Sequence, residues 1–120
     1  MEANEPESSI LGLPATRLIA YSNSDGRFTR TLGRAAPPDP GLAGGLDVLV
    51  AAARELGRGR AFGALRMAVL GFAEATVLVG CLPQESLVYV VTDPDSTQLG
   101  LLLSHLRALL STAAREEALS

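Results

Sequence analysis

Two aspartates, Asp93 and Asp95, flank a proline directly after an apolar, strand-like run. Paired carboxylates can act as a general acid and a general base, provided that further polar groups converge on the same point. No second polar cluster accompanies these two residues in the sequence. Asp95 also stands three residues before Gln98, which is the spacing of a capping box, and an acid there faces the positive end of a helix. The sequence therefore favours helix capping over acid–base chemistry.

The single histidine and the single cysteine are the other residues that could ligate a metal or attack a substrate. His105 has no cysteine or carboxylate at a spacing that would complete a metal site. Its neighbour Ser104 points to another side of the expected helix, so the two cannot form a nucleophile and base pair. Cys81 lies in a strand-like run, where a small buried hydrophobe is the usual interpretation. We therefore expect no enzyme activity, no cofactor and no metal.

Arginine supplies all ten basic residues of the chain. Arg58 and Arg60 stand in the segment Gly-Arg-Gly-Arg, where glycines could let backbone N–H groups approach an anion. The spacing is not that of a P-loop, and a solvated loop is the plainer interpretation. Arg27 and Arg30 gather around a β-prone run and could contact an acidic partner, a solvated strand edge being the alternative. These four arginines are our candidate partner contacts.

Composition limits the class of protein. The chain has 120 residues, 48% of them hydrophobic, and a net charge of −3, which fits one domain with an ordinary core. A nucleic-acid-binding protein would combine a basic balance with aromatic residues, so we expect no nucleic-acid partner. The longest apolar run, residues 67–82, is interrupted by Gly71, Glu74 and Gly80, so we expect no membrane span. The lone cysteine and the acidic N-terminus favour a cytoplasmic location.

The chain divides into an N-terminal segment and a run of regular elements. Residues 1–14 carry three glutamates and little apolar surface, which predicts a flexible tail without a full helix. Residues 15–117 form the predicted single domain. Thr16–Tyr21 and Phe28–Leu32 are β-prone and are joined by a turn with an Asp-Gly pair, which predicts a hairpin. A helix should follow over Gly41–Leu56, with Asp39 as its N-cap.

Three apolar runs then predict consecutive strands at Leu65–Leu70, Ala75–Leu82 and Leu87–Thr92, separated by short turns. A Leu-rich helix should start near Asp95 or Ser96, and its apolar stripe recurs at helical spacing. The order is β-β-α-β-β-β-α. It predicts an α+β domain with a five-stranded, mainly antiparallel sheet and two helices.

The helix over Gly41–Leu56 has more apolar surface than one sheet face requires. Its expected core stripe contains Leu42, Leu46, Leu49, Ala53 and Leu56, yet Val48 and Ala52 extend the apolar arc around the helix. Either these residues merely pad an exposed face, or they form a partner surface, and a second copy of the chain is the commonest such partner.

The strand Leu65–Leu70 follows this helix and would lie at a sheet edge. An apolar edge tends to pair with another strand, although Arg66 could instead act as a simple guard against such pairing. We therefore predict a dimer interface that combines the helix and this strand. It comprises Val48, Ala52, Glu55, Arg66, Met67, Ala68 and Val69.

The order and spacing of these elements resemble the roadblock/LC7 family. The residues that carry the resemblance are the hairpin Leu18-Ile19-Ala20-Tyr21 with Asp25-Gly26, the apolar helix Leu42–Leu56, and the final block of Leu87–Asp93 followed by Leu99-Gly100-Leu101-Leu102. The resemblance spans Thr16 to Ala114 and implies a roadblock/profilin-like fold. Domains of this family usually open with a helix before the first strand, which residues 1–14 are not expected to supply.

The resemblance also implies a function. Members form homodimers, or heterodimers with another roadblock protein, in which the central helix and the next strand pair across a two-fold axis. They serve as scaffolds or regulators of small Ras-like GTPases, of dynein-type motors in eukaryotes, or of polarity systems in bacteria. A bacterial, non-enzymatic GTPase regulator is therefore the implied function. The alternative is a small-molecule sensor of the profilin, longin or PAS type, in which a sheet face holds the ligand.

Overall fold

The structure is a computed structural model, and it describes residues 3–35, 39–94 and 97–119. Its described strands form one antiparallel sheet in the order β2-β1-β5-β4-β3. The strands are β1 (Thr16–Ser22), β2 (Phe28–Gly33), β3 (Met67–Gly71), β4 (Thr76–Cys81) and β5 (Leu87–Thr92), and the helices are α1 (Glu5–Leu11), α2 (Pro40–Gly59) and α3 (Leu99–Leu119). The predicted α+β class with five antiparallel strands is confirmed.

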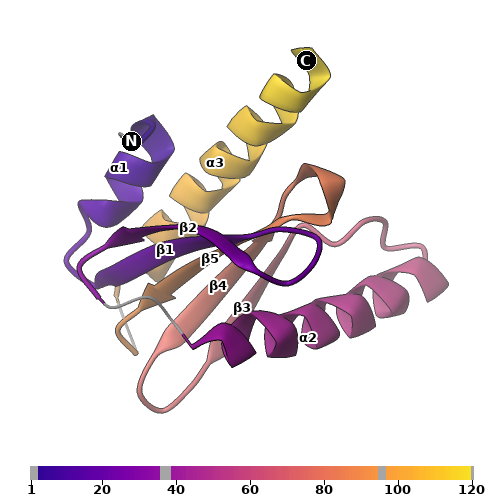
Figure 1. Ribbon diagram of the computed structural model, residues 1–120, viewed down its shortest axis with the longest axis horizontal. Coiled ribbons are helices and arrows are strands. Elements are labelled where there is room, and N and C mark those ends of the chain that lie inside the picture. Colours follow the sequence, from indigo (N-terminus) through magenta and orange to yellow (C-terminus); the bar gives the residue numbers. More distant parts are fainter. Residues whose placement is uncertain (1–2, 36–38, 95–96, 120) are drawn as a thin grey trace.

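The sheet lies between two helical layers, with α2 on one face and with α1 and α3 on the other (Figure 1). Successive residues of a strand point to opposite faces, so each central strand contributes to both cores. On β4, for example, Val77 and Val79 belong to the core under α2, whereas Leu78 belongs to the core under α1 and α3. None of the helices in the described ranges is both long and apolar enough to cross a membrane.

Helix α1 corrects the prediction for the N-terminus. The flexible tail expected over residues 1–14 is wrong at Glu5–Leu11, and the described helices are three where two were expected. Asn4 and Glu7 form a reciprocal capping box, in which the Glu7 N–H donates to Asn4 Oδ1 at 2.9 Å and the Asn4 N–H donates to Glu7 Oε1 at 2.8 Å. Ile10 is fully buried in the core that it shares with Leu109 of α3. Capping and burial together hold this short helix.

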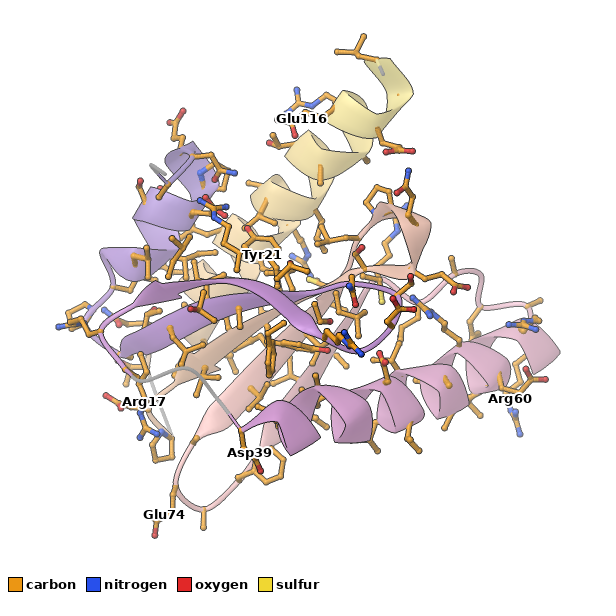
Figure 2. All side chains as sticks on the ribbon, viewed as in Figure 1. Arg17, Tyr21, Asp39, Arg60, Glu74 and Glu116 are labelled. Carbon is orange, nitrogen blue, oxygen red and sulfur yellow. The ribbon has the colours of Figure 1, made fainter. Side chains whose placement is uncertain are left out.

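Helix α2 begins as predicted and ends one turn later than expected. The Asp39 carboxylate accepts from the Gly41 N–H at 3.3 Å, which confirms the predicted N-cap. The helix continues through Gly57 to Gly59, and the N–H groups of Arg60 and Phe62 then donate to the Gly57 carbonyl. Asp39 and Arg60 thus lie at opposite ends of α2 (Figure 2).

Helix α3 packs closely against the sheet because β4 carries a glycine beneath it. A Cβ atom at Gly80 would stand 2.9 Å from Leu110 Cδ2 and 2.9 Å from Val88 Cγ1. The described helix runs from Leu99 to Leu119. The predicted cap at Asp95 lies outside the described residues.

Candidate interaction surface

Helix α2 buries a narrower set of residues than the sequence predicted. Ala43, Leu46 and Val50 are buried against the sheet. Leu49 and Leu56, which were expected on the sheet, are 51% and 54% exposed, so this part of the prediction is wrong. The buried stripe is rotated around the helix axis toward Val50, and both leucines join the side that Val48, 70% exposed, and Ala52 already occupy.

The positions of Asp47 and Arg54 on α2 show in which direction Leu49 and Leu56 point. Asp47 lies against the β1–β2 turn, where a Cβ atom at Gly26 would meet Asp47 Oδ2 at 2.9 Å. Arg54 lines a polar groove of about 410 Å³ with Ser24 of the same turn. Helix residues two positions apart are separated by about 160° around the axis. Leu49 and Leu56, two positions after Asp47 and Arg54, therefore face away from this turn and toward the β3 side of the sheet.

Strand β3 forms the edge of the sheet on that side. In the described part of the chain it pairs only with β4, so its outer N–H and C=O groups face outward. Val69, in the middle of the strand, is 43% exposed. Met67 and Ala68 are half-buried, and Arg66 is exposed just before the strand begins. The strand starts two residues later than predicted.

We call the exposed apolar side of α2, together with the outer edge of β3, the α2–β3 surface. It comprises Val48, Leu49, Ala52 and Leu56 of α2 and the outer edge of β3. On that strand the Val69 side chain, opposite Leu78, points to the sheet face that α1 and α3 cover. Of the residues predicted for an interface, Val48 and Ala52 lie on it, and Arg66–Val69 lie along the strand edge. Glu55 instead lines the polar groove that Asp47 and Arg54 also line. The predicted interface did not include Leu49 and Leu56, which are exposed beside Ala52. Their spacing with Ala52, at intervals of three and four residues, was the signal available.

The four arginines proposed as partner contacts do not share a site. Arg58 and Arg60 are exposed at the C-terminal end of α2, and Arg27 is exposed in the β1–β2 turn. Arg58 Nη1 lies 3.5 Å from Glu55 Oε2 in a solvated pair on the helix surface. Arg30 instead lies with α1 on the other face of the sheet, where it has a partner within the chain.

That partner belongs to a buried polar cluster that fastens α1 to the sheet. Glu7 is 1% exposed and accepts hydrogen bonds from Tyr21 Oη and, at 2.9 Å, from Arg30 Nη1. The Arg30 guanidinium also lies 5.6 Å from the centre of the Tyr21 ring. Burial, assisted by the Glu7 carboxylate, raises the pKa of Tyr21 well above its usual range. This cluster has a structural role that the sequence did not reveal.

Asp93, one of the residues first considered for chemistry, also has a structural role. Asp93 accepts from Arg17 Nε at 2.9 Å, and Arg17 Nη2 donates to the Glu74 carbonyl, which ties the β3–β4 turn to the end of β5. Arg17 and Glu74 lie at the same end of the molecule (Figure 2). Over residues 3–35, 39–94 and 97–119, no group of three or more His, Cys, Asp or Glu side chains is placed to hold a metal ion.

Known structures with a similar fold were found in bacteria. MglB from Myxococcus xanthus superposes with a TM-score of 0.75 at 14% identity, over 96% of this chain and 91% of that one. The gliding protein MglB from Thermus thermophilus gives 0.71 at 18% identity, over 96% and 93%. A roadblock/LC7 domain from Streptomyces avermitilis gives 0.65 at 17% identity over the full length of both chains. No family model matches the sequence, and no curated protein matches it.

Proposed function

Because the chain has the roadblock/LC7 fold, we propose that it is a non-enzymatic, dimer-forming module that scaffolds or regulates a small Ras-like GTPase. The partner in the dimer is a second copy of the chain. The alternative is a heterodimer in which another roadblock protein takes the place of the second copy. The observation that carries the proposal is the α2–β3 surface. An exposed apolar helix side and an open strand edge face the same direction on the molecule.

Antiparallel pairing of β3 with β3 of a second copy would use both features at once. Two identical strands that pair in this way are related by a two-fold axis perpendicular to the sheet, so each face of one sheet continues into the same face of the other. The two α2 helices then lie side by side across the axis. Leu49 and Leu56 would face the second α2, and Val69 would lie near the axis at the centre of the strand pair.

Burial of the exposed apolar side chains of α2 would favour the dimer. Full burial of a valine or leucine side chain contributes about 1.5–3 kcal/mol, and Val48, Leu49 and Leu56 are each about half exposed or more in the single chain. Six such side chains from two copies would contribute on the order of 5–10 kcal/mol. Strand pairing adds to this gain, while lost translational and rotational freedom opposes it by about 4–15 kcal/mol.

The oligomeric state tests the first half of the proposal. Light scattering during size exclusion at micromolar concentration should give the mass of two chains. Val48→Glu and Ala52→Glu place charges on the α2–β3 surface and should each give a folded monomer. Ala51→Glu is the matched control, because Ala51 is exposed and lines the polar groove with Asp47 and Arg54. A monomeric wild-type protein would disprove the dimer, and equal dissociation by all three variants would place the interface elsewhere.

Binding to a GTPase tests the second half. The fold and the resemblance to a family that acts with small Ras-like GTPases support this partner. The small Ras-like GTPase encoded nearest to this chain in its genome is the candidate to purify, loaded either with GDP or with a non-hydrolysable GTP analogue. We expect binding that depends on the nucleotide and is lost in the Val48→Glu monomer. Absence of binding to either loaded form, with the dimer intact, would contradict the GTPase role and leave the dimer standing.

A further inference from the structure

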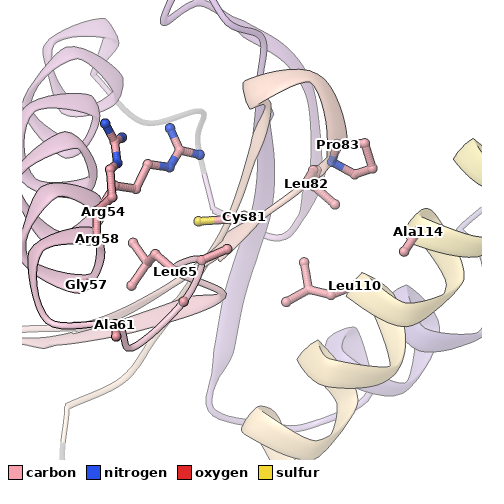
Figure 3. A pocket seen from close by; sticks show the side chains of 12 residues that line it. Arg54, Gly57, Arg58, Ala61, Leu65, Cys81, Leu82, Pro83, Leu110 and Ala114 are labelled. Carbon is pink, nitrogen blue, oxygen red and sulfur yellow. The ribbon is translucent and has the colours of Figure 1, made fainter.

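A groove with an apolar floor runs around the end of the sheet between α2 and α3. Its larger part has a volume of about 600 Å³ and lies between the C-terminal ends of α2 and β4 and the C-terminal half of α3. A second part of about 380 Å³ continues it along α3 beside the start of β3. Both parts share Cys81, Leu110 and Ala114, so they form one groove. Figure 3 shows α2 and α3 on its two sides with Cys81 and Leu65 between them.

The floor of the groove is made of partly exposed apolar side chains, which a bound partner would bury further. Leu65, Leu82 and Leu110 are half-buried and line its larger part. They pack at the margins of the two cores, so their inner atoms are already buried and their outer atoms face the groove. A segment that binds here should therefore present apolar side chains of its own.

The rim of the groove is basic. Arg54 and Arg58 of α2 line its larger part, and Arg66 and Arg107 line its continuation. No aspartate or glutamate is among the described residues that line either part. Arg58 has a solvated pair with Glu55, whereas Arg54, Arg66 and Arg107 make no ion pair within the part of the chain that the structure describes. This local excess of positive charge contrasts with a chain whose net charge is −3.

We propose that this groove binds an acidic, amphipathic segment of a partner protein. Apolar side chains of the segment would cover the floor, and its carboxylates would pair with the arginines, whose planar guanidinium groups accommodate carboxylates in two parallel hydrogen bonds. A small anion alone would leave the apolar floor of the groove uncovered. The four arginines oppose a basic segment directly.

This binding site is distinct from the α2–β3 surface. Val48, Leu49, Ala52 and Leu56 do not line the groove, and of the residues predicted for the dimer interface only Arg66 and Met67 border it. The two activities can therefore be separated by mutation. A dimeric protein with a free groove could hold its second partner while the α2–β3 surface is occupied.

A designed peptide tests the site. The probe is a synthetic peptide of about 15 residues with leucines three and four positions apart and glutamates at the flanking positions, labelled for fluorescence anisotropy. Its counterpart carries lysine in place of every glutamate. We expect the acidic peptide to bind the full chain with a dissociation constant of about 10 µM or tighter. The lysine peptide should bind at least about tenfold more weakly, and raising the salt from about 0.05 M to about 0.3 M should weaken the acidic complex.

Three variants within the groove and one control outside it test whether the peptide binds there. Arg107→Glu and Arg54→Glu should each weaken binding of the acidic peptide by about tenfold. Arg27→Glu changes the net charge equally at an exposed position outside the groove, so it should alter binding by less than about twofold. Ala114→Trp fills the groove from α3 without changing charge and should abolish binding. Each variant is first checked by circular dichroism for its fold.

Three outcomes would overturn the site. One is failure of the acidic peptide to bind at about 1 mM. Equal binding of the two peptides would remove the charge selectivity, and an equal loss with Arg27→Glu would remove the location. Because the dimer is measured separately by light scattering, a negative result here leaves the proposed dimer untouched.

Discussion

Leu46 is 2% exposed, whereas Leu49, one turn further along α2, is 51% exposed. Both are leucines in a helix whose apolar residues occupy much of its circumference, yet only one packs against the sheet. Asp47, on another side of the helix, lies near the β1–β2 turn, and Leu49 faces toward the free edge of β3. Leu49 is therefore available to a partner that covers this side of α2.

Replacement of these two leucines should separate folding from association. Leu46→Ala removes a buried side chain and should lower the free energy of unfolding by about 2–5 kcal/mol, measured by urea denaturation. Leu49→Ala should lower the stability of the single chain by less than about 1 kcal/mol, because half of the side chain is already in water. It should instead weaken the dimer at least about fivefold in sedimentation equilibrium. A loss of stability as large as that of Leu46→Ala would show that Leu49 serves the core.

Pairing of β3 across the dimer axis should bring the two Val69 residues close together. In a Cys81→Ser background, Val69→Cys should form a disulfide-linked dimer under mild oxidation, because opposed residues of antiparallel strands have Cα separations of about 4.5–5.5 Å. Thr31→Cys is the control, since Thr31 is exposed on β2 at the other edge of the sheet. Cross-linking at Thr31 with none at Val69 would assign the dimer to the β2 edge.

The sequence predicted the elements best where local signals suffice. Strand β5 has the predicted bounds, Leu87–Thr92, because a continuous apolar run is bounded on both sides by turn residues. The hairpin followed from the Asp-Gly pair, and Gly26 does adopt a positive φ of 76°. In both cases the deciding interactions lie within a few residues of one another.

Helix α1 and the orientation of α2 depend on distant residues instead. Seven residues are too few for a stable isolated helix, so α1 exists because Ile10 packs near Leu109 and Glu7 pairs with Arg30. The apolar arc of α2 is so broad that its sequence does not show which side faces the sheet. The packing of Ala43, Leu46 and Val50 against the sheet, and of Asp47 near the β1–β2 turn, involves residues far apart in the sequence.

The tyrosines should make stability fall at high pH. Burial is the main reason that the pKa of Tyr21 and of Tyr89 is raised above the ordinary value of 10.0 in the folded chain. A raised pKa in the folded state contributes stability below pH 10 that is lost as the pH rises further, because the unfolded chain then releases the proton first. The slope is at most about 1.4 kcal/mol per pH unit for each tyrosine, and less for Tyr21, which is partly exposed and so partly screened.

Urea denaturation between about pH 9 and pH 11.5 measures this slope. Tyr21→Phe should flatten the curve, and Tyr89→Phe should flatten it independently, because Tyr89 lies on the other face of the sheet with Ser22 as its hydrogen-bond partner at 3.0 Å. Tyr21→Phe should also loosen α1, whose Glu7 loses a donor. An unchanged slope in both variants would mean that other groups govern the alkaline transition.

Two glycine-to-alanine substitutions should change stability in opposite directions. At Gly80 the new methyl group would stand 2.9 Å from Leu110 Cδ2 and 2.9 Å from Val88 Cγ1, so α3 must move outward, at a cost of about 1–3 kcal/mol in the free energy of unfolding. At Gly100, on α3, nothing lies within 4 Å of the added atom. Alanine has fewer backbone conformations than glycine in the unfolded chain, so Gly100→Ala should stabilise the protein by about 0.4–1 kcal/mol. Thermal and urea denaturation of both variants, compared with wild type, measure the difference. Stabilisation by Gly80→Ala would show that α3 does not rest on β4 as closely as these distances require.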